Sequence, residues 1–203
     1  MTVPTEPDEA PAAGSATARD LLHYLRQSRE AVVGALDGLS EHDVRRPLTP
    51  SGTNLLGLVK HLAGIELDYL GTCVGRPAPV TLPWVEDGSV WDGADLWARA
   101  EEPRSWVLDL YRTAWVHSDA SVAALPLDAP ASVSWWREGR RETTFGHLLV
   151  RVVAETAQHA GHADILREGL DGRGGRDHDV QGDATWWAAY VARIQAAADA
   201  FRD

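Results

Sequence analysis

The chain has 203 residues, of which 44% are hydrophobic, so it can bury one substantial core and is expected to form a single domain. Its formal net charge of -11 and its single lysine argue against nucleic acid or a membrane surface as a partner, because phosphate groups are bound by clustered basic residues. A lone cysteine, Cys73, and the absence of an apolar run of roughly 20 residues fit a protein of the reducing cytoplasm without a membrane span.

Residues 1–16 are not expected to belong to the folded core. Residues 1–16 are acidic and rich in proline and alanine, and they lack the basic start and apolar stretch of a secretory signal. We therefore expect a disordered tail over 1–16, followed by one domain over 17–203.

Apolar residues recur at helical spacing in most of that domain. Helices are expected over 16–40, 54–75, 94–124, 144–170 and 183–201. Pro103 should lie in a first turn or a kink, so the third segment can be two pieces. The long connections 41–53, 76–93 and 126–143 are rich in proline, glycine and polar residues, with at most an extended segment at 132–136 and no strand pair. This order predicts an all-α four-helix bundle with long crossover loops and a C-terminal helix packed on it.

The helix ends carry recognisable signals. Ser15 or Thr17 can cap the first helix, and Thr143 or Thr144 the fourth. The fourth helix should stop at Asp171 and Gly172, because glycine readily adopts the left-handed conformation that ends a helix.

The stretch ETAQHAGHADIL, residues 155–166, interrupts the apolar stripe of the fourth helix. At about 100° per residue, Glu155, His159 and His162 share an arc of roughly 80° with Leu148, Val152 and Leu166. An ionised carboxylate in a bundle interior costs several kcal/mol unless it is paired or bound to a cation. Something must therefore satisfy Glu155.

A divalent metal ion would do so. Glu155 and His159 lie one turn apart, and a carboxylate with an imidazole suits zinc, nickel or iron(II), of which zinc tolerates this set without redox chemistry. His61, on the flank of the apolar stripe of the second helix, is the candidate third ligand. Three protein ligands would leave positions open for water or substrate, which is typical of a catalytic site.

Other interpretations of these residues stay open. Glu155 could pair with Arg151, one turn away, and the histidines could be hydrogen-bonded core residues. His162 could be a ligand, or could orient Glu155 or a bound substrate from outside the ligand set. His162 and Arg151 are therefore the candidate catalytic residues beside the metal. Tryptophans in the long loops, Trp84, Trp91, Trp135 and Trp136, are expected to pack, although loops are also where substrate specificity is found.

Three stretches of the chain resemble a known family: SGTNLLGLVKHLAGIE, LPLDAPAS and, most specifically, ETAQHAGHADILREGLDG. They are similar to the DinB-like superfamily of metal-binding four-helix bundles, and in particular to an actinobacterial branch that carries a domain of unknown function. The resemblance covers nearly everything from Ala18 to Ala197 and implies that His61, Glu155 and His159 hold the metal. Many DinB-like relatives have a histidine in place of the glutamate, whereas the mycothiol-dependent maleylpyruvate isomerases have a glutamate, as this chain does.

The resemblance also implies an activity, in which the metal binds the thiol of mycothiol, bacillithiol or glutathione and lowers its pKa. We expect a metal-dependent enzyme that acts on a small molecule as a monomer or homodimer. It would most simply be a mycothiol-type S-transferase or isomerase that activates a thiol or water, and a hydrolase is also open. The alternative is a non-catalytic bundle that binds a metal or a ligand. No obvious basic cluster would hold a sugar-based thiol, although several arginines are available: Arg45, Arg46, Arg140, Arg141 and Arg151.

Overall fold

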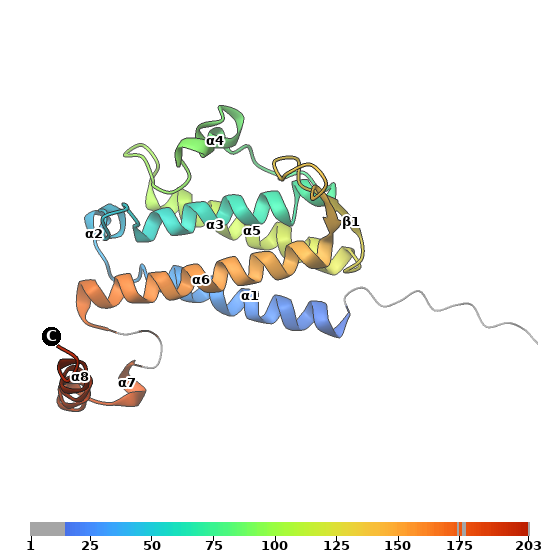
Figure 1. Cartoon of the computed structure of the whole chain (residues 1–203). Helices are drawn as coiled ribbons and strands as arrows, with labels where there is room; N and C mark the ends of the chain where they lie inside the picture. The colour runs from blue at the N-terminus through green and yellow to red at the C-terminus, as the bar shows by residue number, and fades with distance from the viewer. Residues whose placement is uncertain (1–14, 174, 176–177, 203) are drawn as a thin grey trace, which may run out of the picture.

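A computed structural model describes residues 15–173, 175 and 178–202, and four long helices dominate it (Figure 1). These are α1 (Ala16–Gly34), α3 (Leu55–Tyr69), α5 (Arg104–Ala124) and α6 (Phe145–Asp171). α1 packs most extensively against α6 and α3 against α5, and α3 also contacts α6. Leucine, valine, alanine and aromatic side chains fill the interior, where each fully buried large one contributes about 1.5–3 kcal/mol. The predicted all-α bundle is confirmed.

The first two helices each begin directly after a serine that caps them. The Ser15 hydroxyl accepts a hydrogen bond from the amide of Ala18 and caps α1, while residues 1–14 of the expected tail lie outside the described residues. α1 ends at Gly34, earlier than predicted. A short helix, α2 (Glu41–Arg45), stands where a loop was predicted, because Ser40 caps it and Val44 is buried.

The second long helix is shorter than the periodicity suggested. The Asn54 side chain accepts a hydrogen bond from the Gly57 amide and starts α3, which ends at Tyr69. A 3-10 turn, η1 (Thr72–Val74), continues the segment to Gly75, whose φ of 72° closes it. The predicted end near Gly75 thus belongs to η1 and not to the α-helix.

The segment between α3 and α5 is mostly turns. It contains α4 (Pro83–Glu86) and η2 (Ser89–Asp92) within the predicted loop, and Trp84 there is buried. The helix predicted from Ala94 begins only at Arg104, directly after Pro103, so the prediction of helix over 94–103 was wrong. Residues 94–102 instead form turns that contact α3, where Lys60 donates hydrogen bonds to the carbonyls of Ala94 and Trp97.

A small sheet precedes α6. β1 (Pro130–Ser132) pairs antiparallel with β2 (Glu142–Thr144), with Ala131 opposite Thr143. The prediction that no strand pair exists was therefore wrong, and the expected extended segment at 132–136 was placed too late. The α6 boundaries were predicted correctly: the Thr144 hydroxyl accepts a hydrogen bond from the His147 amide, and Gly172, with a φ of 76°, ends the helix.

The C-terminal segment holds α7 (His178–Gln181) and α8 (Ala184–Asp199), which Asp183 caps. α8 was predicted to pack on the bundle, but none of its residues is buried, and Figure 1 shows it beyond the end of α6, apart from the four long helices. Its aromatic side chains stack on one another instead, as Trp186 and Tyr190 do. Within the described residues, the helices lack the combination of length and apolarity that crossing a membrane requires.

Candidate metal centre

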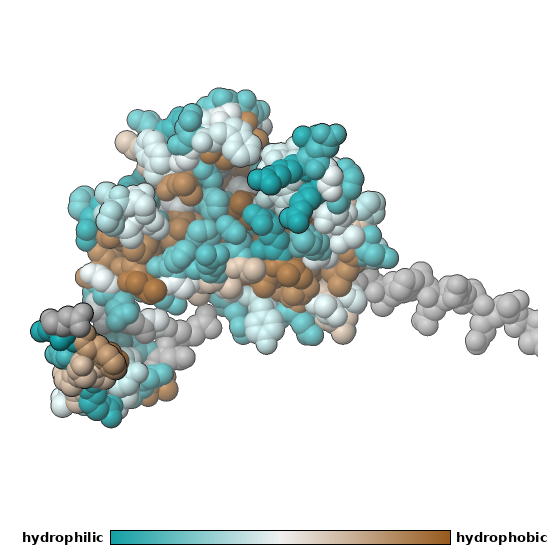
Figure 2. Space-filling model, in the orientation of Figure 1, coloured by the Kyte–Doolittle hydropathy of each residue, from teal (hydrophilic) through white to brown (hydrophobic). Residues whose placement is uncertain are grey.

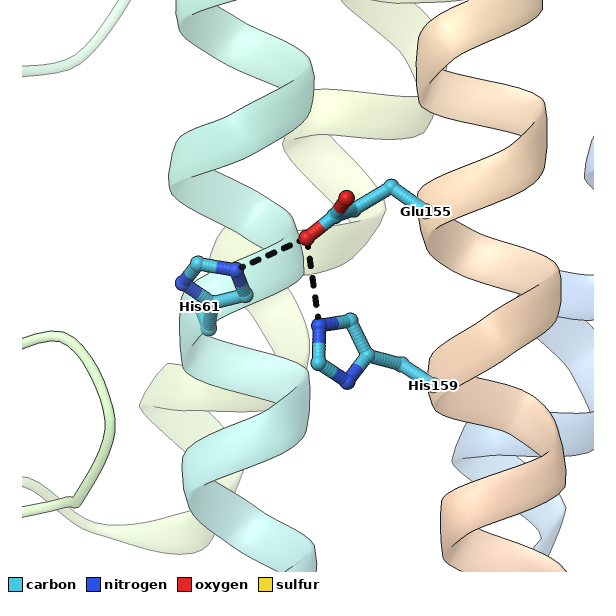
Figure 3. A group of neighbouring side chains, drawn as sticks. All are labelled: His61, Glu155 and His159. Carbon is cyan, nitrogen blue, oxygen red and sulfur yellow. Dashed lines mark ion pairs between the residues drawn. The ribbon is translucent and has the colours of Figure 1, made fainter.

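The contact between α3 and α6 brings the three predicted ligands together. His61 projects from α3, and Glu155 and His159 project from successive turns of α6 (Figure 3). One ligand atom from each residue lies within 4.8 Å of the other two. The Glu155 Oε1 atom is 3.7 Å from Nε2 of His61 and 3.3 Å from Nε2 of His159.

These separations fit a bound transition metal. With metal–ligand bonds of about 2.0–2.2 Å, two ligand atoms of a tetrahedral site lie about 3.4 Å apart. The two measured separations, 3.3 Å and 3.7 Å, fall on either side of that value. All three side chains are only partly buried, so the site also keeps an open face. The donor set and its spacing therefore fit a divalent ion with room for one further ligand.

A fourth side chain, Asp95, orients the candidate ligand His61. Its Oδ2 atom lies 2.6 Å from Nδ1 of His61. Because a carboxylate can only accept, the Nδ1 atom is the donor to Asp95, and Nε2 is the ring atom that faces Glu155. Carboxylate–histidine–metal arrangements of this kind fix the imidazole tautomer and raise its basicity. Sequence reasoning missed Asp95, since it lies 34 residues from His61 in the segment predicted as helix.

The loop that carries Asp95 is held against α3 by three residues between the N-cap of this helix and His61. A Cβ atom on Gly57 would overlap the Leu96 carbonyl, so only glycine allows this approach. The Asn54 amide donates to that same carbonyl at 3.1 Å. The buried ammonium of Lys60 donates to the carbonyls of Ala94 and Trp97 and to the Glu102 carboxylate; these bonds fix the backbone on both sides of Asp95.

Electrostatics favour a neutral imidazole at His159. Burial lowers the pKa of His159, and the neighbouring His61 and His162 lower it further, against the opposing effect of Glu155. A neutral imidazole is the form that a metal needs. His162 is exposed and does not belong to the group of ligand atoms, so its predicted place on the buried stripe was wrong. Its Nδ1 atom lies 3.3 Å from Nδ1 of His159, which places it at the rim of the site.

Arg151 does not pair with Glu155, which was the open alternative for that carboxylate. Its guanidinium lies over the rings of Tyr69, at 5.1 Å, and Trp136, at 5.8 Å. Glu155 therefore has imidazoles as its near neighbours, and Arg151 is left on the adjoining surface.

A cavity of about 540 Å³ opens beside His61 and Asp95. Its lining is largely apolar and aromatic, including Ile65, Val85, Val90, Trp91, Leu96 and Trp135. Besides Asp95, a second carboxyl group lines it: burial raises the pKa of Asp68 to about 6, and among the described residues no hydrogen bond or ion pair to it is formed. Trp91 and Trp135 thus border a substrate-sized space, whereas Trp84 is packed in the core, as expected.

Cys73, in η1, is a packed thiol. It is buried, and burial together with the nearby Asp68 carboxylate raises the pKa of the Cys73 thiol to about 12. Because the thiolate is the reactive form, this side chain is inert near neutral pH. A reacting sulfur at this site would have to come from another molecule.

The comparison with protein families agrees with this geometry. A family described as mycothiol S-transferase matches residues 20–172, which include the three donor residues and Asp95 and end at the glycine that closes α6. No curated protein matches the chain. The matched span is the bundle itself, and α7 and α8 lie outside it.

Proposed function

The chain belongs to the mycothiol S-transferase family, and we propose that it joins the sulfur of mycothiol to an electrophilic small molecule at a divalent metal held by His61, Glu155 and His159. One observation carries the metal-dependent part of the proposal: three ligand atoms from two helices converge, and His61 also lines an apolar cavity. Zinc is the first candidate, because it accepts this donor set without redox chemistry.

The metal, when bound, would lower the pKa of a thiol that coordinates it, so that a thiolate is available near neutral pH. Asp95 keeps the proton of His61 on Nδ1 and thereby holds Nε2 ready as a donor. His162, exposed at the rim and in contact with His159, is the proposed acceptor that passes the thiol proton to solvent.

The cavity beside His61 is the proposed binding site for the electrophile. A space of about 540 Å³ matches the size of common small-molecule sites, and its apolar lining would hold an electrophile while excluding water. The sulfur then forms a bond to the electrophilic carbon, and the leaving group departs with the bonding electrons. Since the only cysteine of the chain is buried and its pKa is raised to about 12, the sulfur is supplied by the cosubstrate.

Metal analysis and turnover together test this proposal. Purified protein should carry about one equivalent of zinc, nickel or iron, and His159→Ala should lose it. Conjugation of 1-chloro-2,4-dinitrobenzene should require mycothiol, and it should fall about 100-fold or more in His159→Ala because the thiol is no longer activated. His23→Ala, which removes an exposed histidine of α1, is the matched control and should retain both properties.

Each outcome separates the possible functions. Wild-type protein without metal, and a His159→Ala variant with unchanged turnover, would rule out the metal-dependent reaction. Metal binding without turnover of any thiol and electrophile pair would instead favour the non-catalytic metal- or ligand-binding bundle.

A further inference from the structure

Three arginines near the candidate metal centre form no ion pair with a carboxylate of the described residues. The net charge of the chain is -11, and many of its arginines pair with carboxylates: Arg26, Arg29, Arg45, Arg46, Arg104, Arg112, Arg167, Arg173 and Arg202. Among the residues that the structure describes, Arg137, Arg140 and Arg151 form no ion pair with a carboxylate. In a chain with an excess of acidic residues, a cluster of unpaired arginines calls for an explanation.

The three arginines line one hollow of about 960 Å³, together with Trp135 and Trp136. We call it the arginine hollow. Figure 2 shows strongly hydrophilic residues gathered over the loop between β1 and β2, beside a depression in the surface. Trp135 borders both the arginine hollow and the cavity beside His61, and Arg151 stands one turn before Glu155 on α6. The hollow therefore adjoins the candidate metal centre.

The hollow is held in shape before any ligand enters. The amide of Val133 donates to the Arg141 carbonyl, and the Arg141 side chain donates to the Trp136 carbonyl, so the loop is tied back on itself. The indole nitrogens of Trp135 and Trp136 each lie 3.4 Å from the Tyr69 hydroxyl. An ordered loop reduces the entropy lost when a ligand binds.

The donor groups of Arg151 remain available in this arrangement. Its guanidinium lies over the rings of Tyr69 and Trp136, and its N–H groups form no hydrogen bond or ion pair with any described residue. The one carboxylate that lines the hollow, Glu142, accepts a hydrogen bond from the Ser132 hydroxyl at 2.9 Å. A second acidic residue of the loop, Glu138, forms no ion pair with a residue in the described part of the chain.

Guanidinium groups without an acidic partner favour an anionic ligand, and the carboxylate group fits them well. Arginine presents a planar fork of donors that matches the two oxygens of a carboxylate, and the tryptophan rings offer flat apolar surfaces beside it. We propose that the arginine hollow binds a carboxylate on the electrophilic substrate, so that the preferred acceptors are flat or aromatic carboxylic acids. This proposal rests on the proposed function for the reaction itself, but the binding of the acid can be measured without turnover.

The substrate would then bridge two subsites. Its carboxylate lies against Arg140 and Arg151, its flat body lies along Trp135, and its reactive carbon reaches the cavity beside His61. With an aryl chloride, the thiolate sulfur bonds to the ring carbon, chloride leaves with the bonding electrons, and the thiol proton goes to the buffer. The remote carboxylate takes no part in that step, so it serves only for recognition.

The test compares 4-chloro-3-nitrobenzoate with 4-chloro-3-nitrobenzamide, which differ only in the charged group. Calorimetric titration of the full chain should show the acid binding about tenfold more tightly than the amide, and added salt should weaken only the acid. Arg140→Gln and Arg151→Gln should each reduce this acid-to-amide ratio severalfold. Arg112→Gln removes an exposed arginine of α5 and is the matched control, for which the ratio should not change.

Equal affinity of the wild-type protein for the acid and the amide overturns the proposal, and so does undetectable binding of the acid. A ratio that persists in both Arg140→Gln and Arg151→Gln overturns it as well. The same two probes, incubated with mycothiol, report on the reaction separately. Preferential binding of the acid without conjugation counts against the S-transferase reaction alone, whereas conjugation of the probes together with equal affinity for the acid and the amide counts against the carboxylate subsite alone.

Discussion

Two polar clusters lie in the same helical bundle, and they are built on opposite principles. In the first, the Arg29 guanidinium bonds to both oxygens of Glu66, at 2.9 Å and 2.5 Å, and to Asp119 at 2.7 Å. Arg29 and Glu66 are at most 1% exposed, yet each charge meets an opposite one. In the second cluster, His61, Glu155 and His159 turn acceptor atoms toward one point.

The difference shows that a buried charge by itself does not mark a functional site. The first cluster is closed, since its donors and acceptors satisfy one another. The second is open: the Glu155 carboxylate faces the two imidazoles at 3.7 Å and 3.3 Å, longer separations than those in the first cluster, and all three side chains are partly exposed. An open cluster of this kind is what a cation or a substrate can complete. Removal of one residue from each cluster should therefore affect different properties of the protein.

The largest expected effect on stability comes from the closed cluster. Glu66→Ala leaves Arg29 buried opposite a single, partly exposed carboxylate, so we expect a loss of about 3–5 kcal/mol in the free energy of unfolding. His159→Ala, measured by urea unfolding in the presence of a chelator, should cost less than about 1 kcal/mol. Replacement of both Arg29 and Glu66 by leucine should recover most of the loss. An equal loss in Glu66→Ala and His159→Ala would erase the distinction between the two clusters.

A smaller effect, on metal affinity, is expected from Asp95, which is hydrogen-bonded to His61 of the second cluster. Asp95→Asn keeps the size of the side chain but removes the charge that holds the proton on His61, so zinc affinity should fall about 10–100-fold. Competition with a chromophoric chelator measures this affinity. Asp128→Asn, in an exposed turn before β1, is the matched control. Unchanged zinc affinity in Asp95→Asn would mean that the Asp95–His61 bond has no part in metal binding.

The smallest effect is a gain in stability. Because burial raises the pKa of Asp68 from 3.8 to about 6, the folded chain binds the proton more tightly than the unfolded chain. The protein therefore loses stability as the pH rises from about 4 to about 6, and at higher pH the ionised carboxyl remains a cost. Asp68→Asn should stabilise the fold by about 1–2 kcal/mol near pH 7.5, and the gain should shrink toward pH 4. A gain that is constant across this range would contradict the role of ionisation.

Features that depend on neighbouring residues could be predicted from the sequence. The boundaries of α6 follow from Thr144 and Gly172, and the meeting of Glu155 with His159 follows from helical periodicity. His61 could be chosen because it was the histidine on the flank of an apolar stripe, although its contact with α6 is a tertiary one.

Features that depend on distant residues could not be predicted in this way. The hydrogen bond between His61 and Asp95 joins residues 34 positions apart and requires a loop that Lys60 and Gly57 hold in place. No local sequence pattern predicts such a contact. The β1–β2 pair escaped notice because each strand has three residues, too few for an alternating pattern. The amphipathic pattern of α8 predicted a helix correctly but wrongly suggested that it packs on the bundle.

The burial of Lys60 has a practical consequence. It is the only lysine of the chain, its side chain is 1% exposed, and its ammonium is surrounded by the loop that positions Asp95. Reagents that acylate lysine would thus find no accessible lysine on the folded protein, and carboxyl- or histidine-directed chemistry is the better route for attaching the protein to a surface. Acylation of Lys60 itself would show that the loop carrying Asp95 has separated from α3.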